Sequence, residues 1–102
     1  MFLHQYAPMA FYIYIIQSLK DNSFYKGFTE NPNSRIIAHN NGESKYTSLK
    51  TPWRFVYLEE MPSKREALIR ERGLKKYSHL QINQLINSPK NELLKILGSS
   101  AG

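Results

Sequence analysis

A chain of 102 residues, 41% of them hydrophobic and 22% charged, has the length and composition of one small globular domain. It contains no cysteine, which excludes disulfide bonds, thiolate metal ligands and cysteine nucleophiles. A formal net charge of +6 favours polyanionic partners that carry phosphates. The longest apolar run, residues 11–16, is too short to cross a bilayer and no secretory signal precedes it, so we expect a cytoplasmic protein with no membrane partner.

The first predicted element is a β-hairpin. Residues 11–17 are aromatic and β-branched, residues 19–23 are rich in turn formers, and residues 24–28 have the composition of a second strand. Residues 1–10 show no periodic pattern, and we expect them to be a loosely held extension.

A helix, a loop and a third strand are predicted next. Asn31 followed by Pro32 is typical of a helix start, because asparagine caps the first turn and the missing proline N–H costs nothing there. We expect this helix to reach Asn40. Residues 43–51 are polar and predict an ordered loop, and residues 53–59 have the composition of a third strand.

The last third of the chain is predicted to be helical. A Ser-Lys-Arg-Glu capping box begins a helix over residues 63–77, and two shorter helices are expected over residues 80–87 and 90–97. Residues 98–102 are expected to be a tail. The order ββαβα plus short helices indicates a single α+β domain over residues 11–97.

The tyrosines of the hairpin are predicted to meet on one face of the sheet. A turn that pairs Gln17 with Phe24 sets the register of the two strands. In that register Tyr14 lies opposite Gly27 and diagonal to Tyr25, so the two phenols converge over a glycine, a residue often found where a ring comes close. The alternative is that these tyrosines only fill a half-buried strand surface, which suits their strand propensity.

Arg35 and His39 lie one turn apart on the first predicted helix, so they present a cation and a titratable ring together. Each also has a structural explanation. Arg35 can be a solvated surface residue, and His39 can be favoured by the negative C-terminal end of the helix. The residues alone leave these alternatives open.

Glu71 is a carboxylate on the apolar face of the second predicted helix, beside Ala67. A carboxylate in that place needs a hydrogen bond, a cation or a metal ion. The structural explanation is an ion pair with Arg70, Arg72 or Lys75.

Taken together, these residues resemble the GIY-YIG nuclease family, and in particular its small bacterial members, which are similar to the catalytic domains of excision-repair and structure-specific endonucleases. Tyrosine triplets at residues 12–14 and 25–27 precede Arg35 on the following helix and Glu71 on the helix after the third strand. The resemblance covers residues 11–77. It implies a three-stranded antiparallel sheet flanked by helices, with a divalent-metal-dependent nuclease site on one face.

The resemblance also implies a role for each site residue. Tyr25 would activate the attacking water, and Tyr14 would assist and hold the substrate phosphate. Arg35 would stabilise the charge that develops at phosphorus, and His39 would support the site. Glu71 would be the sole protein ligand of a Mg²⁺ or Mn²⁺ ion at the leaving oxygen, which suits the preference of magnesium for one carboxylate and several waters.

The charge and the resemblance together imply a surface that binds DNA. No DNA-reading or zinc-binding module is expected beside the nuclease domain, so the implied substrate is structured or single-stranded DNA cut without sequence specificity. Two alternatives remain: a non-catalytic nucleic-acid-binding module, and an adaptor that docks to a repair or replication protein through the C-terminal helices. The candidate nucleic-acid contacts are Lys26, Lys45, Tyr46, Thr47, Arg70, Lys75 and Lys76.

Overall fold

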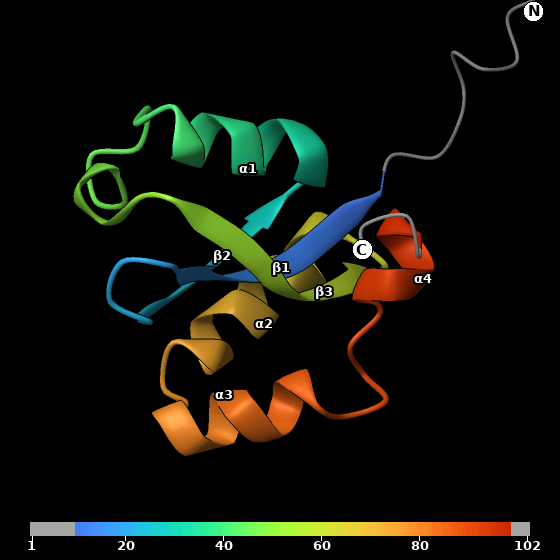
Figure 1. The fold of residues 1–102 in the computed structure, drawn as a ribbon. Helices are drawn as coiled ribbons and strands as arrows, with labels where there is room; N and C mark the ends of the chain where they lie inside the picture. The colour runs from blue at the N-terminus through green and yellow to red at the C-terminus, as the bar shows by residue number, and fades with distance from the viewer. Residues whose placement is uncertain (1–9, 99–102) are drawn as a thin grey trace, which may run out of the picture.

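The computed structural model describes residues 10–98, which form an antiparallel sheet with helices on both faces (Figure 1). The strands are β1 (Phe11–Ser18), β2 (Phe24–Thr29) and β3 (Trp53–Met61), in the order β2-β1-β3 across the sheet. The helices are α1 (Pro32–Asn40), α2 (Lys64–Leu74), α3 (His79–Ile86) and α4 (Leu93–Leu97), with a short 3-10 turn, η2, at Ser48–Lys50. The α+β fold expected from the sequence is confirmed.

The predictions for the two ends of the chain lie almost wholly outside the described residues. Of the expected extension over residues 1–10 only Ala10 is described, and of the expected tail over residues 98–102 only Gly98 is. Within the described range, no helix combines the length and the apolar character that crossing a membrane requires.

The central strand β1 supplies side chains to both layers of the core. Ile13 and Ile15 pack with Tyr57 beneath α2 and α3, whereas Tyr14 and Ile16 pack on the opposite face, towards α1 and α4. All five side chains are at least 99% buried. This alternation is the period of two expected for a strand with both faces covered. Figure 1 shows α1 on one side of the sheet and α2 and α3 on the other.

Side-chain caps begin three of the helices, as the sequence predicted. The Asn31 side chain caps α1, and the Ser63 hydroxyl accepts the backbone N–H of Glu66 at the start of α2. Ser78 and Gln81 form a complete capping box at α3. The box predicted at α2 is only half formed, because among the described hydrogen bonds the Glu66 side chain makes no return bond to Ser63.

Two predicted helix boundaries are wrong. Helix α2 ends at Leu74, short of residue 77, because Gly73 weakens its last turn and the chain continues as a turn in which Lys76 N–H bonds to the Gly73 carbonyl at 3.1 Å. The last helix begins at Leu93, not at residue 90.

The late start of α4 is explained by Asn91. Its side-chain amide donates to the carbonyls of Val56 and Ile86, both at 2.9 Å, and its side-chain oxygen accepts from the Leu58 N–H at 3.2 Å. These bonds hold residues 88–91 as a connection along β3, so the helix starts only after it. Leu93, Ile96 and Leu97 of α4 are partly buried against the core cluster that contains Leu58, which removes most of the free face that the adaptor alternative requires. Leu94 is 67% exposed.

Candidate active site

The pairing of β1 with β2 places Tyr14 over Gly27, in the register predicted from the sequence. Gln17 pairs with Phe24 and Tyr14 pairs with Gly27. A Cβ atom added at residue 27 would lie 2.5 Å from Oη and 2.6 Å from Cζ of Tyr14, so only glycine leaves room for the ring. The ring centre of Tyr25 is 6.4 Å from that of Tyr14. The predicted convergence of the two phenols over a glycine is confirmed.

The hydroxyl of Tyr14 joins β1 to two residues of α1. Nε of Arg35 donates to this oxygen at 3.2 Å, and Nε2 of His39 lies 2.8 Å from it. A guanidinium can only donate, whereas a phenol and a neutral imidazole can each give or accept a proton, so one proton lies in the Tyr14–His39 bond in either tautomer of His39. The structure thus brings Arg35 and His39 together with Tyr14, and the solvated-surface explanation of Arg35 does not hold.

Burial sets the charge states of this group. It lowers the pKa of His39 from 6.5 to about 4, with help from the positive charge of Arg35. Burial also raises the pKa of Tyr14 to about 12; the hydrogen bond and charge of Arg35 act against that rise, and the charges of Tyr25 and Glu71 add to it. Tyr14 and His39 are therefore both neutral at pH 7. The hydrogen bond to Tyr14 is the main reason that the pKa of Arg35 is raised, so its positive charge is secure.

The other ring nitrogen of His39 is held by Thr47. Nδ1 lies 2.7 Å from Oγ1 of Thr47, which is fully buried, and the Thr47 carbonyl accepts the indole N–H of Trp53 at 2.9 Å. The side chain of Asn40 in turn bonds both the N–H and the carbonyl of Trp53, at 2.6 and 3.0 Å. Thr47 is one of the predicted nucleic-acid contacts, but the structure places its hydroxyl against His39 and leaves its side chain fully buried. Its positioning role was missed, since the contact crosses a loop.

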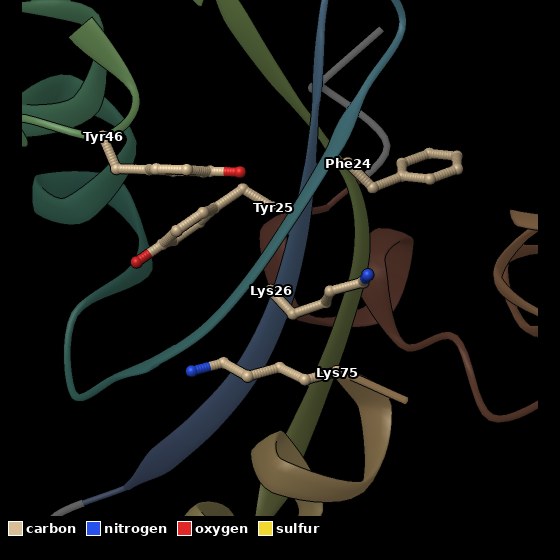
Figure 2. Close-up of a pocket in the computed structure, with 5 residues that line it drawn as sticks. All are labelled: Phe24, Tyr25, Lys26, Tyr46 and Lys75. Carbon is tan, nitrogen blue, oxygen red and sulfur yellow. The ribbon is translucent and has the colours of Figure 1, made fainter. Parts of the chain in front are cut away.

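A hollow of about 380 Å³ opens along the edge strand β2 beside these tyrosines (Figure 2). Figure 2 shows Tyr25 and Tyr46 side by side, with Lys26 and Lys75 below them. Four residues predicted separately from the sequence therefore gather at one place. Burial lowers the pKa of Lys26. The fifth lining residue is Phe24.

Glu71 lies at the border of the core. Its side chain is 19% exposed, and its carboxylate is 3.7 Å from Nζ of Lys75, which is one of the three ion pairs anticipated from the sequence. The lysine is 59% exposed, and such pairs are weak. The negative charge of Glu71 also reaches Tyr14, as the smallest of the influences that raise its pKa.

The chemistry of Glu71 fits a hard divalent cation. Residues 10–98 contain no group of three or more histidine, acidic or cysteine side chains arranged to hold a metal ion. Glu71 is the residue that would hold such an ion, and a single protein carboxylate suits magnesium, which is usually bound by one or two.

Three of the predicted basic contacts lie away from the hollow. The Arg70 guanidinium is held by Glu59, with Nε 3.1 Å from the carboxylate oxygen that also accepts the Tyr57 hydroxyl at 2.8 Å. Each side chain of this ion pair is only 22% exposed, so Arg70 is already engaged by Glu59 and offers little surface to a nucleic acid. Lys45 and Lys76 are exposed but do not line the hollow.

The fold and this arrangement of residues define a GIY-YIG catalytic domain, and the family profile matches residues 10–83. The chain belongs to the GIY-YIG family. It is 47% identical over 78 residues to a UPF0213 protein of Clostridium perfringens, covering 76% of this chain and 83% of that protein. A UPF0213 protein of Staphylococcus saprophyticus is 43% identical over 77 residues, covering 74% and 93% of the two chains.

A solved structure supports the same assignment. The solution NMR structure of a UPF0213 protein from Bacillus halodurans is similar to this chain with a TM-score of 0.53 and 33% identity, covering 90% of this chain and 98% of that one. Family membership indicates a nuclease-type domain that binds nucleic acid.

The burial of neutral His39 predicts a dependence of stability on pH. Because its pKa is about 4 in the folded protein and 6.5 otherwise, the unfolded chain binds more protons between these values. The contribution of neutral His39 to the free energy of unfolding should therefore be complete above pH 6.5. This contribution should be lost as the pH drops towards 4, which lowers the free energy of unfolding by at most about 3 kcal/mol. Urea denaturation over this range, compared with His39→Gln, should show the difference between the two proteins shrinking with acid. Parallel curves would mean that folding leaves the pKa of His39 unchanged, which would contradict its burial in the neutral form.

The contact between Tyr14 and Gly27 predicts a second effect. Gly27→Ala should lower the free energy of unfolding by about 1–3 kcal/mol, because the added methyl group displaces a buried ring that is fixed at its hydroxyl. Gly73→Ala is the matched control. A Cβ atom added at Gly73 would meet no atom within 4 Å beyond its chain neighbours and the nearby backbone of its own helix. Alanine there should therefore be neutral or stabilising by up to about 1 kcal/mol. Equal stabilities of Gly27→Ala and the wild type in urea would contradict the close contact.

Proposed function

We propose that this protein is a divalent-metal-dependent endonuclease that hydrolyses phosphodiester bonds of structured or single-stranded DNA without sequence specificity. The observation that carries the proposal is the meeting of Tyr14, Arg35 and His39 in one hydrogen-bonded group, with Tyr25 beside it in a basic hollow. This group presents phenols and a positive charge to a phosphate, and Glu71, which pairs with Lys75 of the hollow, adds a carboxylate nearby. Phosphodiester hydrolysis uses all three kinds of group.

The accessibility of the two tyrosines supports different roles for them. Tyr25 lines the hollow, where a substrate phosphate and an attacking water can reach its hydroxyl. Tyr14 is 1% exposed, and its pKa of about 12 keeps it protonated. We assign the activation of water to Tyr25, which shares the hollow with Lys26 and Lys75. Tyr14 assists by holding Arg35 and His39 in place through its hydroxyl.

Arg35 and His39 complete the protein's part of the chemistry. Arg35 carries a secure positive charge at the Tyr14 hydroxyl, where it can stabilise negative charge that develops on a bound phosphate. His39 is neutral and buried, so it acts by fixing Tyr14 and not as a cation towards DNA.

Glu71 is the proposed ligand of Mg²⁺ or Mn²⁺. When bound, either ion would supply stabilisation of the charge on the leaving oxygen. Lys75 would give up its weak pairing with Glu71 on metal binding and become free to contact a phosphate.

A cleavage assay on the purified chain tests the proposal. End-labelled single-stranded, flapped, branched and duplex DNA, together with RNA, would be incubated with Mg²⁺ or Mn²⁺. We expect cuts in single-stranded or branched DNA and none in EDTA. Tight binding without cleavage of any substrate in either metal would overturn the proposal in favour of a non-catalytic nucleic-acid-binding module.

A further inference from the structure

We propose that Tyr46 is a stacking platform that holds an unpaired nucleobase beside the active site. The inference rests on the proposed nuclease function and narrows its substrate to strands that offer at least one unstacked base. It specifies the nucleic-acid contact predicted for Tyr46 as a contact with a base.

The Tyr46 side chain is exposed on a loop that is well anchored. It is 66% exposed, although the next residue, Thr47, is fully buried and bonded to His39 and Trp53. The loop also closes on itself through the Ser48 N–H, which bonds to the Ser44 carbonyl at 2.9 Å. A large aromatic side chain therefore projects into solvent from an anchored loop and contributes little to the core.

One side of this ring already faces the proposed site. The centres of the Tyr46 and Tyr25 rings are 5.7 Å apart with their planes tilted by 38°, and Tyr25 in turn lies 5.2 Å from the ring of His39. Aromatic rings thus extend from the buried group at Tyr14 through Tyr25 to Tyr46 at the surface. Figure 2 shows the outer two of these rings, Tyr25 and Tyr46. A planar group stacked on the exposed part of Tyr46 would continue this series and stand next to Tyr25.

The charges around Tyr46 fit the rest of a nucleotide. Lys26 and Lys75 line the same hollow. Nζ of Lys50, which also pairs with Asp21 at 3.5 Å, lies over the Tyr46 ring at 6.0 Å from its centre. A nucleotide is a flat base joined to an anionic phosphate, which matches an exposed ring bordered by ammonium groups. A base inside a duplex has both faces covered by its neighbours, so only an unpaired or extruded base can use the platform.

Binding without cleavage tests this proposal directly. Fluorescence anisotropy in EDTA would measure the Kd of the full chain for labelled oligothymidylate and for a duplex of equal length. Tyr46→Ala should weaken binding of the single strand by about 5- to 100-fold, the range expected for one lost base–aromatic stack, and change duplex binding by less than about 2-fold. Tyr46→Phe, which keeps a ring, should bind both like the wild type.

Two controls separate stacking from other causes. Leu49→Ala removes an apolar side chain that is 78% exposed on the same loop, and should leave both affinities unchanged. A strand of abasic nucleotides keeps the phosphates but offers no base, so the wild type and Tyr46→Ala should bind it equally. Equal losses on single strand and duplex, a loss in Leu49→Ala as large as in Tyr46→Ala, or no loss in Tyr46→Ala would each overturn the platform.

The outcome is independent of whether the chain cuts DNA. If the wild type binds with the predicted Tyr46 dependence but never cleaves, the nuclease proposal fails and the platform stands. If it cleaves while Tyr46→Ala binds single strands like the wild type, the platform fails and the nuclease proposal stands.

Discussion

Replacing Glu71 with glutamine is expected to slow DNA cleavage in Mg²⁺ by about 10²–10³-fold, the loss that follows when several kcal/mol of charge stabilisation are removed. Glutamine keeps the size and polarity of the side chain but not the negative charge that a hard cation requires. Because the substitution also removes a negative charge next to Lys75, DNA binding in EDTA should be unchanged or tighter. Single-turnover rates and anisotropy on the same preparation would measure both quantities.

Glu66→Gln is the matched control for this prediction. Glu66 lies in the first turn of the same helix, α2, and is exposed, so the variant carries the same change in net charge away from the hollow. It should cleave at the wild-type rate. Cleavage by Glu71→Gln at that rate would eliminate the metal-ligand assignment even with the nuclease activity intact.

Replacing Tyr25 with phenylalanine is expected to slow cleavage by about 10²–10⁴-fold, the usual contribution of a positioned acid or base. The change removes one hydroxyl from a side chain that lines the hollow and leaves its ring contacts with Tyr14, His39 and Tyr46. Thermal stability and DNA affinity should therefore match the wild type. Tyr77→Phe, on the other side of the sheet, removes a hydroxyl without touching the hollow and should cleave normally. A Tyr25→Phe protein that cleaves as fast as this control would place the activation of water elsewhere.

Much of the site could be predicted because it depends on short-range rules. The hairpin fixes the register, and the register alone puts Tyr14 opposite Gly27 and diagonal to Tyr25. Helical periodicity places Arg35 and His39 on one face of α1, and the structure bonds both to Tyr14.

What the sequence could not supply depends on how elements pack against one another. Arg70 lies in α2 and Lys75 directly follows its last residue, yet Arg70 is held by Glu59 whereas Lys75 lines the hollow. That difference depends on which residues of the sheet each cation meets, and helical periodicity does not contain it.

The loop after α1 shows the same limit. Thr47 and Tyr46 are adjacent and were both predicted to contact nucleic acid, but one is fully buried and the other is 66% exposed. The direction of each side chain is set by the bonds of Thr47 to His39 and Trp53, which cross from the loop to a helix and a strand. Composition indicates that such a loop is ordered, but not which residue turns inward.

The central claim is that residues from two strands and two helices act as a single metal-assisted site, and the combined variant Tyr25→Phe/Glu71→Gln tests it most directly. Single-turnover cleavage of single-stranded DNA in Mg²⁺ would be measured for the wild type, both single variants and the combined variant. Residues that act as a unit are strongly non-additive, so we predict measurable wild-type cleavage and a combined variant about as slow as the slower single one. If the fold-reductions in cleavage rate of the two single variants multiply in the combined variant, the two residues act independently, and that result would contradict a single site.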